Sequence, residues 1–156
     1  MPWAYRRAAG ITAVSRGVAD DLISELRLDP VCVKVIYNPV VTDRLLRLSA
    51  EPLDHPWAEG NVPIFIGIGR LTSAKNFPLL INAFAKVRET VPCRLVILGE
   101  GELRNELEAL VEKLGRDEDV YMPGVVANPY QWLVASTAFV LSLSNVNYFG
   151  RSHCLT

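Results

Sequence analysis

The chain has 156 residues, half of them hydrophobic, and a formal net charge of −1. This length suits a compact domain with a substantial core, and the near-neutral charge argues against a protein that binds nucleic acid mainly by electrostatic attraction. No apolar run of about eighteen residues is present, so the sequence predicts no membrane span. Cys32, Cys93 and Cys154 are scattered, which indicates a reducing compartment and neither a disulfide framework nor a metal site.

The N-terminal part of the chain predicts a strand, a helix and a second strand. Residues 11–14 form a short apolar run, and Ser15 follows at the position of a helix N-cap. Apolar residues then recur at helical spacing as far as Leu26, and a second apolar run covers residues 33–37. Residues 40–60 contain prolines and charges without a sustained period, so we interpret them as a linker.

After this linker, strands and helices are predicted to alternate. Apolar runs predict strands at residues 64–68, 94–98, 120–122 and 138–143. Apolar stripes with helical spacing begin after Asn76 and after Gly101. A third, shorter helix is expected at Asn128-Pro129, an N-cap residue followed by proline at the first helical position.

The pattern of these strands predicts the fold class. They are continuous apolar runs rather than alternating ones, which indicates burial on both faces of a parallel sheet. Strand–helix–strand repetition predicts a doubly wound α/β fold, a Rossmann-like parallel sheet with helices on both faces. Ligands bind such sheets outside the carboxyl ends of the strands. The candidate binding loops are therefore residues 69–76, 99–102, 124–128 and 144–150.

The first candidate loop carries two cations. Gly69 allows a ligand to approach the backbone, and Arg70 and Lys75 follow it at the start of a predicted helix. Arginine suits bidentate contact with phosphate, and lysine adds a compact charge. These residues form a candidate diphosphate clamp. Their spacing alone favours the alternative, a surface loop whose cations are solvated.

The second and third loops offer backbone rather than charge. Gly99-Glu100-Gly101 is a candidate ligand-facing turn, although a glycine turn with a carboxylate near a helix N-terminus is the simpler interpretation. It lacks the GxGxxG spacing of nicotinamide-cofactor sites. The backbone of Gly124, Val125 and Val126 could face a planar base, although the sequence alone favours a plain strand end. We expect Trp132 to be a packing residue.

Five stretches in this order resemble the retaining glycosyltransferases of family 4, which have the GT-B fold. They read YRRAAGITAVSRGVADDL, VIYNPV, IGRLTSAKNFPLLINAFAKV, RLVILGEGELRNELEAL and VYMPGVVANPYQWL. The resemblance implies that residues 1–39 end an N-terminal, acceptor-side domain and that residues 40–60 link it to a second domain. Residues 61–150 then correspond to part of the C-terminal, nucleotide-sugar-binding domain, and residues 151–156 form an atypical tail.

The resemblance also implies roles for the candidate loops. Gly69, Arg70 and Lys75 match the family residues that hold the donor diphosphate. Gly99-Glu100-Gly101 match the loop that faces the nucleotide sugar, and Gly124, Val125 and Val126 match the backbone that holds the base. The implied donor is a nucleoside-diphosphate sugar of the UDP or GDP type, with no cofactor and no metal.

One family motif is absent from this sequence. The family places a glutamate, and a second one eight positions later, after the last strand found here. Asn147 stands at the first position when Phe149-Gly150 are aligned with the family's Phe-Gly, and Leu155 stands at the second. The catalytic residues therefore stay unassigned. The chain resembles an internal fragment of a longer enzyme, and we expect it to be weak or inactive alone.

The resemblance implies transfer of a sugar to an acceptor hydroxyl with retention of anomeric configuration. The expected pathway is cell-surface polysaccharide or lipopolysaccharide biosynthesis, with a glycan or lipid-linked acceptor in the parent enzyme and no nucleic-acid partner. The expected location is the cytoplasm, with peripheral contact at the inner membrane face left open. A non-catalytic nucleotide-binding module or degenerate remnant is the alternative of a different class.

Overall fold

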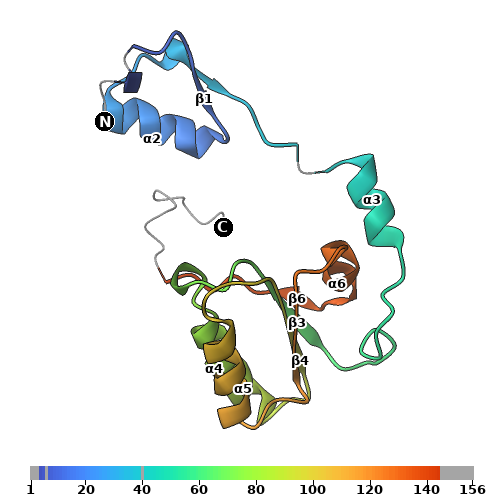
Figure 1. Ribbon diagram of the computed structural model, residues 1–156. Helices are drawn as coiled ribbons and strands as arrows, with labels where there is room; N and C mark the ends of the chain where they lie inside the picture. The colour runs from blue at the N-terminus through green and yellow to red at the C-terminus, as the bar shows by residue number, and fades with distance from the viewer. Residues whose placement is uncertain (1–3, 6, 40, 145–156) are drawn as a thin grey trace. The chain divides into compact units, whose positions relative to one another are not determined.

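The computed structural model describes residues 4–5, 7–39 and 41–144. These residues form two compact units that divide between Val41 and Thr42, here called the first unit and the second unit (Figure 1). Among the helices of the described residues, none is long and apolar enough to span a membrane.

The first unit is a small strand–helix–strand element. Strands β1 (Ile11–Ala13) and β2 (Val33–Val35) pair in parallel, and α2 (Arg16–Leu26) and a short 3₁₀ helix (Pro30–Cys32) connect them. The Ser15 side chain accepts a hydrogen bond from the Val18 N–H at 3.2 Å, which confirms the predicted N-cap. Both strands are shorter than predicted.

The second unit contains a parallel sheet with the strand order β5-β4-β3-β6 in the described part of the chain. Its strands are β3 (Ile64–Ile68), β4 (Arg94–Leu98), β5 (Val120–Gly124) and β6 (Ala138–Phe139). Its helices are α3 (Asp43–Ala50), a 3₁₀ helix (Ser73–Lys75), α4 (Phe77–Arg88), α5 (Arg104–Lys113) and α6 (Pro129–Ala135). The bounds of β3 and β4 are those predicted, whereas β6 is shorter than the predicted run 138–143.

The residues of the central strands alternate between two apolar clusters. Leu95 and Ile97 pack with α4 and α5 on one face of the sheet. Val96 and Leu98 pack with Trp132 of α6 on the other face, and Figure 1 shows these helices on opposite sides of the strands. Both faces of β4 are therefore buried, which explains its continuous apolar run and confirms the predicted α/β fold with helices on both faces.

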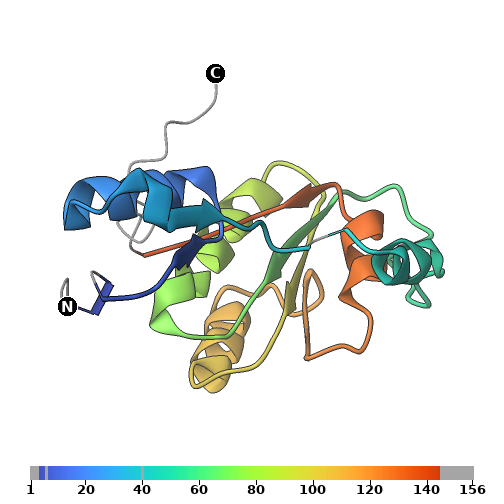
Figure 2. The same ribbon diagram turned by 90° about the horizontal axis from the view of Figure 1, so that it is seen from above.

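Helix α3 lies within residues 40–60, for which the sequence analysis expected only an irregular linker. The Thr42 side chain caps the helix by accepting from the Leu45 N–H at 3.2 Å. The Asn128 side-chain amide donates to the Leu48 carbonyl and to the Glu51 carboxylate, both at 2.8 Å. Figures 1 and 2 show α3 beside α6. So short a helix is marginal by itself, and these contacts far along the chain stabilise it.

An aromatic cluster surrounds His55 on the α6 side of the sheet. The centroid of its imidazole ring lies 4.8 Å from that of Tyr121 and 4.9 Å from that of Trp132. Its Nδ1 accepts the Trp57 N–H at 3.2 Å, which favours the neutral ring. Trp132 is 5% exposed, so its predicted packing role is confirmed.

Stability is expected to fall at acidic pH because of His55. Burial lowers the pKa of His55, the positive charge of Arg94 lowers it further, and Asp54 opposes both. The contribution of His55 to stability is therefore complete above the unfolded pKa of about 6.5 and decreases as the pH falls through that value toward the folded pKa. Urea unfolding followed by tryptophan fluorescence from pH 5 to pH 8 should show a smaller pH dependence for His55→Gln than for wild type. Equal pH dependences would contradict this role.

Candidate functional site

A cavity of about 450 Å³ lies at the carboxyl ends of the strands of the second unit. The residues that line it come from three adjacent segments: Ile68–Arg70 at the end of β3, Leu98–Glu100 at the end of β4, and Val125, Val126 and Pro129 after β5. Strand β4 lies between β3 and β5 in the sheet, so its loop forms the middle of the cavity wall. The structure thus brings three of the four predicted binding loops together.

Backbone hydrogen bonds connect these three segments. The Gly69 N–H donates to the Leu98 carbonyl at 3.0 Å, and the Leu71 N–H donates to the Glu100 carbonyl at 2.9 Å. The Gly99 N–H donates to the Gly124 carbonyl at 2.8 Å. These bonds extend the sheet pairing beyond the strand ends and hold the three segments of the cavity wall together.

Close backbone approach explains both glycines of the Gly-Glu-Gly turn. Gly99 has φ 139°, and a Cβ at this position would overlap the Gly69 carbonyl oxygen. A Cβ at Gly101 would lie 2.5 Å from the Leu71 carbonyl oxygen. A side chain at either position would therefore separate the β3 and β4 loops.

The two predicted cations lie on one loop but in different environments. Arg70 is exposed and lines the cavity. Lys75 ends the 3₁₀ helix, and its Cε lies 3.3 Å from the position that a Cβ on Gly69 would occupy. Neither Lys75 nor the first turn of α4 is among the described residues that line the cavity. The structure therefore places Gly69, Arg70 and Lys75 close together on one loop. That this loop binds a diphosphate stays a prediction.

The segment after β5 forms an apolar wall. Gly124 is the last residue of β5, is buried and is not among the described residues that line the cavity, whereas Val125 lines it and is 78% exposed. Val126 lines the cavity and also packs against the apolar cluster on the α6 side of the sheet. This wall presents backbone and aliphatic surface to the cavity. That it binds the base of a nucleotide stays a prediction.

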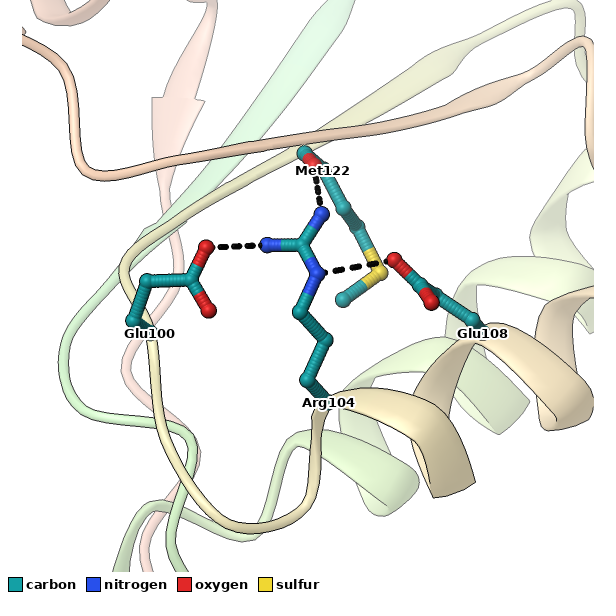
Figure 3. Close-up of polar contacts among 4 residues, drawn as sticks. All are labelled: Glu100, Arg104, Glu108 and Met122. Atoms are coloured by element: carbon teal, nitrogen blue, oxygen red, sulfur yellow. Dashed lines mark hydrogen bonds and ion pairs between the residues drawn. The ribbon is translucent and has the colours of Figure 1, made fainter.

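Arg104, at the start of α5, connects the β4 loop to β5 and was not among the predicted site residues. Its Nη1 donates to the Glu100 carboxylate at 2.5 Å, its Nε to the Glu108 carboxylate at 2.8 Å, and its Nη2 to the Met122 carbonyl at 2.7 Å (Figure 3). The spacing of Glu100, Arg104 and Glu108, four residues apart, was a usable signal. Glu108 is nevertheless exposed, as a carboxylate on a solvated helix face would be.

The positions of the family's acidic motif fall near the end of this chain. Asn147 and Leu155, which stand where the family has glutamates, lie outside the described residues. The same holds for Phe149-Gly150 and for the tail at residues 151–156.

Comparisons with known proteins agree with this arrangement. The chain is 40% identical over 112 residues to the uncharacterized glycosyltransferase MJ1059 of Methanocaldococcus jannaschii, covering 70% of this chain and 28% of that protein. It is 30% identical over 138 residues to N-acetylgalactosamine-N,N'-diacetylbacillosaminyl-diphospho-undecaprenol 4-alpha-N-acetylgalactosaminyltransferase of Campylobacter jejuni, covering 88% of this chain and 36% of that protein.

A solved structure shows the same fold. Anabaena Alr3699/HepE, crystallised in complex with UDP and glucose, superposes with a TM-score of 0.69 at 21% identity, over 95% of this chain and 41% of that chain. The chain spans about a third of the length of the two relatives named above, MJ1059 and the Campylobacter enzyme.

Residues 54–153 match the family of glycosyl transferases group 1. Because this match extends over most of its length, the chain belongs to that family.

Proposed function

We propose that the second unit is the donor-binding part of a glycosyltransferase, which transfers a sugar from a nucleoside-diphosphate sugar to an acceptor hydroxyl with retention. The observation that carries this proposal is the cavity formed by the β3, β4 and β5 loops, with Arg70 at one end and an apolar wall at the other. A nucleoside diphosphate has the same polarity, with a charged diphosphate at one end and a flat base at the other.

The proposed chemistry depends on charge that develops during the reaction. When the bond between the sugar and the diphosphate breaks, negative charge grows on the leaving phosphate. Arg70 can stabilise that charge with a bidentate hydrogen bond, and Lys75 adds a second positive charge on the same loop. We assign the apolar segment Gly124–Val126 to the base, because its backbone and aliphatic side chains can pack on a planar ring.

The relatives guide the choice of substrates. The HepE structure contains UDP and glucose, which supports UDP as the first donor nucleotide to test, with GDP second. The name of the Campylobacter relative describes transfer to an undecaprenol-diphosphate-linked sugar. We therefore propose a glycan or lipid-linked acceptor in cell-surface polysaccharide or lipopolysaccharide biosynthesis, with the protein acting at the inner face of the membrane.

The chain by itself is proposed to bind nucleotide but to turn over weakly or not at all. The positions that carry the donor-orienting glutamates in the family hold Asn147 and Leu155 in this sequence. Release of glucose from UDP-glucose by this chain alone, at a rate above that of a buffer control, would contradict this part of the proposal.

Removing the Arg70 side chain should weaken nucleotide binding strongly. Isothermal titration with UDP, GDP and ADP is expected to show binding to the wild type. Arg70→Ala should raise the Kd about tenfold or more, because a charge-assisted hydrogen bond contributes about 1.5–3 kcal/mol. We expect a smaller increase for Lys75→Ala, since Lys75 does not line the cavity.

The matched control for these variants is Lys86→Ala, which removes one positive charge from the exposed surface of α4. It should leave the Kd within about twofold of wild type, because charges in solvent are screened over distance. Failure of the wild type to bind any of the three nucleotides would refute the donor-site proposal. Binding that both Arg70→Ala and Lys75→Ala leave unchanged would refute the roles assigned to these cations.

A further inference from the structure

The contacts of Arg104 extend the proposed function, on which the following inference rests. We propose that Arg104 is a positioning residue of the donor cavity. It keeps the Glu100 carboxylate on the β5 side of the cavity, so that this negative charge stays away from the β3 loop where Arg70 would bind the diphosphate. Arg104 itself is not among the described residues that line the cavity.

The first support is the place of the Glu100 carboxylate. Glu100 lines the cavity, and its Oε1 lies so close to Gly124 that a Cβ on this glycine would overlap it. Nη1 of Arg104 would lie 3.4 Å from the same Cβ. The absence of a side chain at Gly124 therefore makes room for the ion pair of Glu100 and Arg104 at the end of β5.

The second support is an irregularity in β5 at the same point. In the β4–β5 pairing, Val96 pairs with Tyr121 but Leu98 pairs with Gly124, so the register shifts by one residue between them. Such a bulge re-aims the backbone next to a site. Nη2 of Arg104 donates to the Met122 carbonyl within this bulge at 2.7 Å. One guanidinium thus binds both the β5 bulge and the β4 loop (Figure 3).

The third support is the balance of charge around Arg104. Two carboxylates, Glu100 and Glu108, share this one guanidinium, and both of them are 49% exposed. Glu108 lies one turn further along α5 and orients the Arg104 side chain from the side away from the cavity. Without the guanidinium, Glu100 would be a solvated carboxylate free to rotate, with an unneutralised charge in a cavity proposed to receive a diphosphate.

A measurement without ligand tests the positioning role directly. Hydrogen exchange should be about tenfold faster in Arg104→Gln than in wild type at the Leu71 and Gly99 amides, whose acceptors are the Glu100 and Gly124 carbonyls. The Val96 amide, in the middle of β4, should be unchanged, which shows that the variant is folded. The control is Arg88→Gln, which removes the comparable ion pair between Arg88 and Asp119, and should leave Leu71 and Gly99 unchanged.

Titration with UDP then tests the electrostatic consequence. Arg104→Gln is expected to raise the Kd about tenfold, and Arg104→Lys should also weaken binding because an ammonium group cannot reproduce the three-way contact. The Kd of Glu100→Gln alone is measured as the reference of a double-mutant cycle. The double variant Glu100→Gln with Arg104→Gln should recover to within about threefold of Glu100→Gln, since the repelling charge is gone.

These outcomes separate this inference from the proposed function. A wild type that binds no nucleotide, together with faster exchange in Arg104→Gln, would refute the donor site but support the positioning role. Unchanged exchange at Leu71 and Gly99 in Arg104→Gln would overturn the positioning role whatever the nucleotide data. A double variant that binds as weakly as Arg104→Gln would overturn it as well, because Arg104 would then act on the ligand or the fold and not through Glu100.

Discussion

Replacing Gly99 by alanine is expected to destabilise the second unit by about 3 kcal/mol or more and to abolish nucleotide binding. The backbone at this position has φ 139°, and the added Cβ would overlap the Gly69 carbonyl oxygen. The β3 and β4 loops would have to separate, which breaks the bond from the Leu71 N–H to the Glu100 carbonyl. Urea unfolding monitored by tryptophan fluorescence would measure the change in the free energy of unfolding. Titration with UDP would measure the loss of nucleotide binding.

Gly115→Ala is the matched control for this prediction. Gly115 also has positive φ, at 64°, but a Cβ there would meet nothing within 4 Å. Its replacement should cost only about 1–2 kcal/mol, the cost of a left-handed backbone for an alanine, and should leave nucleotide binding intact. If Gly99→Ala costs no more than Gly115→Ala, the close approach of the β3 and β4 loops does not constrain this position.

Leu107→Ala is expected to destabilise the second unit by about 2–5 kcal/mol. Leu107 is 0% exposed and belongs to the apolar cluster that joins α5 to α4 and to β4. Truncation removes buried aliphatic surface and leaves a cavity between these elements, where the close-packed surroundings can relax only in part. The same urea unfolding experiment measures the loss in free energy of unfolding.

An exposed leucine provides the comparison. Leu79, on α4, is 57% exposed, so Leu79→Ala should change the free energy of unfolding by about 0.5 kcal/mol or less. A similar loss for Leu107→Ala and Leu79→Ala would mean that the packing of α5 on the sheet does not stabilise the second unit.

The strands β3 and β4 could be predicted to the residue, and the reason is local. Each is five residues long and mostly apolar, with Arg94 only at the start of β4, and a glycine, Gly69 or Gly99, follows it directly. A short apolar run that ends at glycine is typical of a buried strand rather than a helix. The Ser15 and Asn128 caps were equally readable, because each side chain bonds a backbone N–H two or three residues away. Such signals involve only residues that are neighbours along the chain, so the sequence alone is enough to find them.

Helix α3 and strand β6 were predicted poorly because their extent depends on distant contacts. Helix α3 has only eight residues, too few for a sustained helical period, and its side-chain contact comes from Asn128, 80 residues from Leu48. Strand β6 pairs with β3 only at Ala138 and Phe139. Farther on, the Ser142 side chain donates to the Lys75 carbonyl at 2.8 Å, away from the sheet ladder. An apolar run cannot show where such pairing ends.

For the candidate site, too, one part could be predicted from the sequence and another part depends on the tertiary structure. The sequence by itself determined that Gly69, Arg70, the Gly99–Gly101 turn and Gly124–Val126 follow parallel strands, because a parallel sheet places all strand ends at one edge. Only the tertiary structure decided that Arg70 lines the cavity and that Lys75 does not. It also decided that Arg104 joins Glu100 to Met122, 18 residues beyond the arginine. The physical reason is that strand order and a register shift of one residue set these distances, and neither leaves a local pattern in the chain.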